Sequence, residues 1–82
     1  MGTYEVVVIV NKQGNYITYR CDVREESSLK AIEAVLEAWQ TGEFPEEAIC
    51  HGHIQYIEVY ETWADDDIGV ISIVESSRKE LP

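Results

Sequence analysis

A single amphipathic segment, residues 28–41, constrains the possible folds of this chain more than any other part of its sequence. Its letters, SLKAIEAVLEAWQT, place apolar side chains at helical spacing, and the predicted buried stripe comprises Leu29, Ile32, Val35, Leu36 and Trp39. Ser27 or Ser28 is expected to cap the start of the helix. Gly42 is expected to end it in the left-handed conformation, and Pro45 prevents its continuation.

Two strand-like segments precede the helix. Residues 4–10, YEVVVIV, are apolar at odd and even positions alike, which is typical of a central strand. Residues 11–15 contain turn formers, including Gly14, and therefore predict a hairpin. Residues 16–23 then alternate between apolar and polar side chains, which predicts an edge strand with one buried face. The side chains expected on that buried face are Ile17, Tyr19, Cys21 and Val23.

The segments after the helix are less regular. Residues 43–48 are predicted as a loop with room for one helical turn. Residues 53–63 are predicted as a strand whose alternation slips near Gln55 and Tyr56, which indicates a β-bulge. This part of the chain is therefore expected to return to the sheet with an irregular third strand.

The last part of the chain predicts a second hairpin. Residues 64–67 form its expected turn, residues 68–74 its second strand, and residues 75–82 a frayed tail. Strand, strand, helix, strand, strand predicts one α+β domain over residues 1–82: a four-stranded antiparallel sheet with one helix packed on one face. The expected strand order is 2-1-3-4, and the alternative is 2-1-4-3, which would make the first and fourth strands parallel neighbours.

One helix can cover only one face of such a sheet, so the other face is expected to be open. The side chains predicted there are Tyr4, Val6, Val8, Val10, Tyr16, Tyr56 and Tyr60. An uncovered aromatic and aliphatic surface of this kind usually marks an interface. We therefore expect this face to bind a partner or a second copy of the chain.

The charge distribution is strongly uneven. The formal net charge is −10, and residues 31–77 contain acidic side chains but no lysine or arginine. Such a field repels nucleic acids and anionic membranes and attracts basic protein surfaces, although solubility alone is a simpler explanation. The acidic residues predicted to contact a partner are Glu43, Glu46, Glu47, Asp65, Asp66 and Asp67. The neighbouring Trp63 is expected either in the core or as a further partner contact.

Membrane and export signals are missing from the sequence. No apolar run approaches the roughly 20 residues of a membrane helix. The start, MGTYEVVVIV, lacks the basic region and small-residue cleavage site of a signal peptide. Two cysteines without such a signal indicate a reducing compartment, so the sequence predicts a cytoplasmic protein.

Cys50, His51 and His53 form the one cluster with metal-ligand chemistry. A structural zinc site needs about four nitrogen or sulfur ligands, and the remaining thiol, Cys21, is expected under the helix. A thiol nucleophile would need an orienting third group and a substrate cleft, for which so short a chain offers little room. Neither a metal, a cofactor nor a catalytic residue is therefore predicted, and Gly52 is expected to mark a bulge or a close backbone approach.

A hairpin followed by SSLKAIEAVLEAW and a strand ending in IEVYE resembles small ββαββ proteins of phages and mobile elements, among them anti-CRISPR inhibitors. The resemblance covers residues 4–62 as a pattern, without an invariant motif, and transfers no residue role. It implies a stoichiometric inhibitor, in some cases an acidic mimic of nucleic acid, that docks on a basic nucleic-acid-binding site of a host protein complex. The alternatives are a small cytosolic homodimer and a Cys/His metal-binding module.

Overall fold

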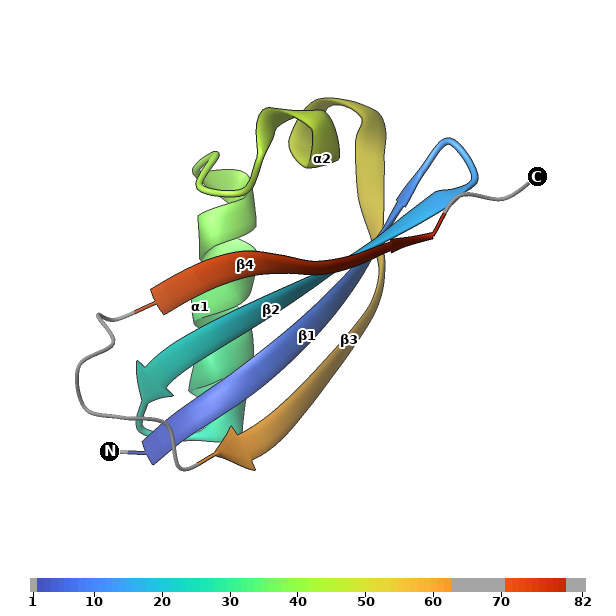
Figure 1. Ribbon diagram of the computed structural model, residues 1–82. Coiled ribbons are helices and arrows are strands. Elements are labelled where there is room, and N and C mark those ends of the chain that lie inside the picture. The colour runs from blue at the N-terminus through green and yellow to red at the C-terminus, as the bar shows by residue number, and fades with distance from the viewer. Residues whose placement is uncertain (1, 63–70, 80–82) are drawn as a thin grey trace.

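Four antiparallel strands form one sheet, and two helices cover one of its faces, in the computed structural model of the chain (Figure 1). The structure describes residues 2–62 and 71–79. The elements are β1 (Gly2–Lys12), β2 (Asn15–Glu25), α1 (Ser28–Gln40), α2 (Glu46–His51), β3 (Gly52–Thr62) and β4 (Ile71–Lys79). The predicted α+β class, with an antiparallel four-stranded sheet and one main helix, is confirmed.

The strand order is β3-β1-β2-β4, which corrects the predicted position of β4. β4 lies beside β2, not beside β3, so β2 is a central strand and the expected edge assignment is wrong. The alternative order is wrong as well, because the neighbours of β1 are β2 and β3. The position beside β2 has a physical reason: it pairs Ile71 with Val23 and Ile73 with Cys21, which adds both isoleucines to the core under the helix.

A two-residue turn joins β1 to β2. Its central residues, Gln13 and Gly14, both have positive φ, 54° and 89°, as a type I′ hairpin requires. The Gly14 backbone N–H donates to the Asn11 side-chain oxygen at 2.8 Å. Because the turn is this short, Lys12 pairs with Asn15, and the register of the whole hairpin follows from that pair.

Helix α1 begins and ends where the sequence predicts. The Ser27 hydroxyl accepts from the Lys30 backbone N–H at 3.2 Å, and Gly42 has a φ of 80°. The buried side of the helix, however, consists of Ala31, Val35 and Ala38.

The predicted apolar stripe of α1 is only partly buried. Val35 is buried as expected, but Leu29 is 64% exposed and Leu36 is 38% exposed, so the helix is rotated to turn Ala31 and Ala38 inward in their place. Small residues on the buried side let the helix approach the sheet closely, and large side chains of the sheet, such as Tyr19, fill the space between them. Trp39 is packed at the end of the helix, as predicted, with its ring 5.2 Å from that of Phe44.

The core lies between the helices and one face of the sheet. Its buried residues are Tyr4, Val6, Val8, Val10, Ile17, Tyr19, Cys21, Val23, Ala31, Val35, Ala38, Phe44 and Ala48. The predicted placement of Tyr4, Val6, Val8 and Val10 on the open face is thus wrong. The hairpin register explains the error: Val6 pairs with Cys21 and Val8 pairs with Tyr19, and partners across antiparallel strands share a face.

Four further predictions concern the second half of the chain, and three of them fall on described residues. The register of β3 shifts between Tyr56 and Ile54, which confirms the predicted bulge. Residues 75–79, which were expected to be frayed, instead continue β4. Segment 43–48 contains the start of α2, a helix longer than the single turn that was expected. The predicted turn at 64–67 lies outside the described residues.

Candidate protein-binding surfaces

The open face of the sheet is the first candidate surface. Its apolar side chains, assigned from the strand register, are Val7, Ile9, Tyr16, Tyr56, Tyr60 and Val74. Tyr56, Tyr60 and Val74 are 50%, 51% and 57% exposed. Tyr16, Tyr56 and Tyr60 therefore lie where the sequence predicts, while Val7, Ile9 and Val74 were missed. The hairpin register would have identified Val7 and Ile9, because it pairs them with Arg20 and Thr18, which lie on the polar side of β2.

Charged side chains on the open face balance one another. The acids are Glu5, Asp22 and Glu58, and the bases are Arg20, Arg24 and Lys79, so the described residues of this face sum to 3 − 3 = 0. Near the middle of the face, Arg20 Nη2 donates to Glu5 Oε2 at 2.7 Å. The open face is thus aromatic and aliphatic with no net charge, although the chain as a whole carries −10.

Two tyrosines flank a carboxylate along the outer strand of this face. Tyr56, Glu58 and Tyr60 alternate on β3, so their side chains project to the same side. The Tyr60 hydroxyl donates to Glu58 Oε2, and hydrogen bonding to the Glu58 carboxylate raises the pKa of Tyr56. This arrangement fixes two exposed rings beside one negative charge.

The second candidate surface is the acidic helix surface, which we define as the exposed Glu33, Glu37, Glu43 and Glu46. Within residues 26–51 the only lysine or arginine is Lys30, and its Nζ lies 3.8 Å from Glu33 Oε2. Part of the negative charge predicted from the sequence therefore lies on the helix layer, on the side of the molecule away from the open face (Figure 1).

Glu47 differs from the other predicted contact acids because cations already surround it. Lys12 Nζ lies 3.2 Å from Glu47 Oε2, and Arg78 Nη2 pairs with Glu47 Oε1. Arg78 Nε also contacts Glu75 Oε1 at 2.9 Å. Hydrogen bonds from Arg78 and then Lys12 lower the pKa of Glu47. Glu47 thus ties α2 to β4 and to the end of β1. Asp65, Asp66, Asp67 and Trp63 lie outside the described residues.

The cysteine and histidine cluster is spread over an exposed corner of the fold. Cys50 and His51 end α2, His53 lies on β3, and all are exposed, whereas Cys21 is buried and its pKa is raised to about 12 by burial and by Asp22. Within residues 2–62 and 71–79, no three His, Cys, Asp or Glu side chains are grouped as metal ligands would be. Gly52 confirms the predicted close approach, since a Cβ there would lie 2.5 Å from Val10 Cγ1.

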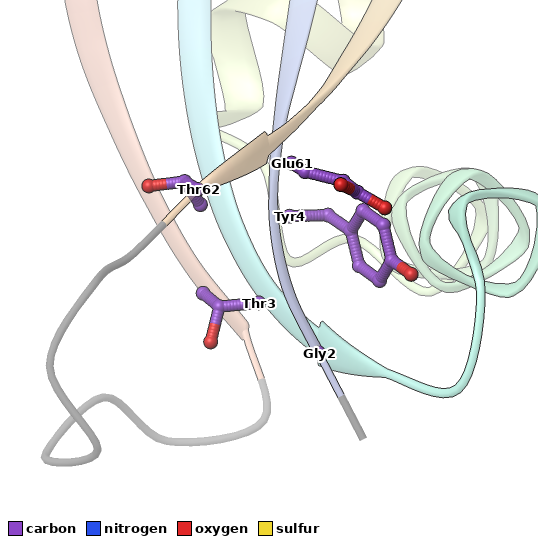
Figure 2. A pocket seen from close by; sticks show the side chains of 5 residues that line it. All are labelled: Gly2, Thr3, Tyr4, Glu61 and Thr62. Carbon is purple, nitrogen blue, oxygen red and sulfur yellow. The ribbon is translucent and has the colours of Figure 1, made fainter.

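A hollow of about 390 Å³ lies at the end of the sheet where β1 begins and β3 ends. It is lined by Gly2, Thr3, Tyr4, Glu61 and Thr62. Figure 2 shows Tyr4 and Glu61 on the side of α1, with Thr3 and Thr62 on the opposite side of the strands. The carboxylate among these lining residues, Glu61, lies on the opposite side of the strands from Thr3 and Thr62, so the described lining does not assemble a hydroxyl nucleophile with a base.

Neither helix of the described chain is long and apolar enough to cross a bilayer. Comparison with known proteins gave no matching family model, no matching curated protein and no matching solved structure.

Proposed function

We propose that this chain is a small non-enzymatic binding protein that docks its acidic helix surface on a basic surface of a partner protein. The observation that carries the proposal is the segregation of charge: Glu37, Glu43 and Glu46 are exposed in a helix layer that contains one lysine, while the opposite face is neutral. A surface with one sign of charge attracts a partner of the opposite sign and accelerates its association.

The sharper form of the proposal is an inhibitor of the anti-CRISPR type, encoded by a phage or mobile element and acting in the host cytoplasm. It is supported by the pattern resemblance of residues 4–62 and by the net charge of −10. In this form the carboxylates of the acidic helix surface occupy lysine and arginine side chains that otherwise hold nucleic-acid phosphates. Glu33 and Glu37 are one helical turn apart, about 6 Å between Cβ atoms, and so present two carboxylates along one line.

The test is capture of a partner from a bacterial lysate on the immobilised chain, at low and at high salt. The screening length falls from about 10 Å at 0.1 M to about 3 Å at 1 M, so binding through the acidic helix surface should weaken steeply with salt. Added nucleic acid should compete for the captured partner. Binding that is insensitive to both salt and nucleic acid would contradict the proposal.

A matched pair of triple variants separates local charge from total charge. Glu37→Gln/Glu43→Gln/Glu46→Gln removes three carboxylates from the helix layer, and Glu5→Gln/Asp22→Asn/Glu58→Gln removes three from the open face. Both variants change the formal net charge from −10 to −10 + 3 = −7. The first should slow association with the partner far more than the second, and equal effects would show that only total charge matters.

A further inference from the structure

The open face of the sheet lies opposite the acidic helix surface. We infer that two copies of this chain associate through their open faces, with the sheets stacked and the helix layers pointing outward. This surface is separate from the one in the proposed function, so either conclusion can fail without the other. Two observations carry the inference, namely the charge of the face and its self-complementary pattern, and the size of the face sets the strength of the association.

Charge selects a second copy as the occupant of this face. Two chains of −10 repel each other least where the surfaces that meet carry no net charge, and the described residues of the open face sum to zero. A basic partner gains nothing from such a face and is drawn to the helix layer instead. Stacked sheets lie about 10 Å apart, and the helix layers lie outside them. The two acidic helix surfaces would therefore be separated by more than the screening length of about 8 Å in physiological salt.

The pattern of the face fits its own copy. Val7 on β1 has Glu58 as its cross-strand partner on β3 and Arg20 as its partner on β2. Glu58, Val7 and Arg20 thus form one row across three strands. A two-fold axis that runs along β1 above Val7 would place the Arg20 position of one chain over the Glu58 position of the other. Val7 would then meet Val7, and Arg20 of each chain would lie over Glu58 of the other. The same axis places Ile9 over Ile9, and Glu5, which it brings near its own copy, is already bonded to Arg20.

The size of the face sets the strength of the dimer. The axis along β1 stacks β3, β1 and β2 of each chain on β2, β1 and β3 of the other. These three strands, about 4.8 Å apart and roughly 27 Å long, present on the order of 400 Å² of flat area per chain. Stable interfaces usually bury about 800 Å² per partner, so this dimer belongs to the weak class. We therefore expect a dissociation constant in the micromolar range and a dimer population that changes with concentration.

Sedimentation velocity of the purified chain from about 10 μM to about 1 mM, in 0.15 M salt, tests the inference. We expect a shift from monomer to dimer across this range. Val7→Lys should weaken the dimer at least tenfold, because it places two like charges at the axis. Leu36→Lys, at an exposed position of α1 outside the face, is the matched control and should leave the association unchanged. Circular dichroism melts of both variants verify that they are folded.

A charge-swap cycle tests the proposed pairing directly. Arg20→Glu and Glu58→Arg should each weaken the dimer about tenfold or more, since each places like charges opposite one another. The double variant Arg20→Glu/Glu58→Arg should recover association. Within one chain the two positions are separated by β1, so the recovery would report a contact between chains. A variant that had lost its fold would not recover association. A chain that is still monomeric at about 1 mM, or a double variant no better than the single ones, would overturn the inference and assign the face to a different partner protein.

Discussion

The two faces of the sheet are built from alternate residues of the same strands, yet they have different physical roles. On the covered face Val6 and Val8 have no exposed area, and the described core contains no polar or charged residue apart from tyrosine hydroxyls and a thiol. On the open face Val7 is half-buried between Arg20 and Glu58. Ile9 is half-buried between Thr18 and Tyr56. Burial of apolar area on the covered face supplies most of the folding free energy, so substitutions on the open face should cost less stability.

The same contrast extends to the charges. Among the described residues, cations and anions on the open face are equal in number, whereas the helix layer exposes Glu33, Glu37, Glu43 and Glu46 beside a single lysine. The molecule therefore presents one surface suited to a neutral neighbour and one suited to a basic neighbour. Substitutions on the two faces, and at the contacts that hold the helices to the sheet, should therefore differ in their effect on stability. The largest effect is expected in the core.

Adjacent valines of β1 give the most direct test of the difference between the faces. Val8→Asp places an unpaired carboxylate in the core and should cost more than about 4 kcal/mol, enough to unfold so small a domain. Val7→Asp lies on the open face and should cost about 1 kcal/mol, the ordinary penalty of aspartate in a strand. Urea unfolding followed by circular dichroism measures both. Similar costs would show that the open face is as tightly packed as the covered one.

The junction of α2 and β3 should also respond strongly. In Gly52→Ala the new Cβ would lie 2.5 Å from Val10 Cγ1 and 2.7 Å from the Ala48 carbonyl oxygen, so the backbone must move. We expect a loss of about 1–3 kcal/mol in the free energy of unfolding. Gly2→Ala is the control, because its Cβ would lie 3.4 Å from the Tyr4 ring, which is close to ordinary contact. An unchanged melting temperature for Gly52→Ala would mean that α2 is loosely attached.

The two cysteines differ in exposure and should differ in chemistry. Cys50 is exposed and should react quickly with a disulfide reagent at pH 8, whereas Cys21 should react only as the chain unfolds. Burial raises the pKa of Cys21 from 9.0 to about 12, so the folded chain holds this proton more tightly than the unfolded chain does. The resulting stability is complete below pH 9 and is lost as the pH rises toward 12, by about 1 kcal/mol between pH 8 and 10.

The Cys21→Ala variant isolates that contribution. At pH 7 it should be less stable because it leaves a small cavity, but its stability should fall less between pH 8 and 10 than that of the original chain. The measurement is urea unfolding at each pH. Parallel pH profiles for the two proteins would assign the alkaline loss to the tyrosines or lysines instead.

The smallest effect is expected at Glu47. Glu47→Gln removes the charge that Lys12 and Arg78 share, but the pairs are solvent-exposed, so the melting temperature should change only slightly. Because those cations lower the pKa of Glu47, its contribution is present above the ordinary glutamate pKa and disappears as the pH falls below the lowered value. Thermal melts at pH 7 and pH 3 should therefore differ less for the variant than for the original chain. A large loss at pH 7 would make the cluster a principal support of α2.

Local signals in the sequence determined much of this structure. The cap at Ser27 and the left-handed Gly42 set the ends of α1, and the alternation of residues 16–23 identified the buried side of β2. The bulge near Gln55 followed from the broken alternation of β3. Each of these features depends on residues that are close together in the chain, where backbone geometry and side-chain spacing act directly.

The sequence also determined which side of β1 is buried, but only through the length of the hairpin turn. A two-residue turn at Gln13 and Gly14 pairs position 12 with position 15, and this register places Val6 and Val8 on the buried side with Cys21 and Tyr19. The alternation of β1 alone could not show this, because the strand is apolar on both sides. Reading the register before the hydrophobic pattern would have assigned the open face correctly.

Only the tertiary structure decided the position of β4 and the rotation of α1. Both depend on which packing buries the most apolar area, a comparison among residues far apart in the chain. With β4 beside β2, Ile71 and Ile73 extend the core, and with Ala31 and Ala38 turned inward, the helix can approach the sheet closely enough for Tyr19 and Phe44 to fill the remaining space. Helical periodicity favoured the larger leucines for the buried side, but volume, which no local pattern encodes, selected the alanines.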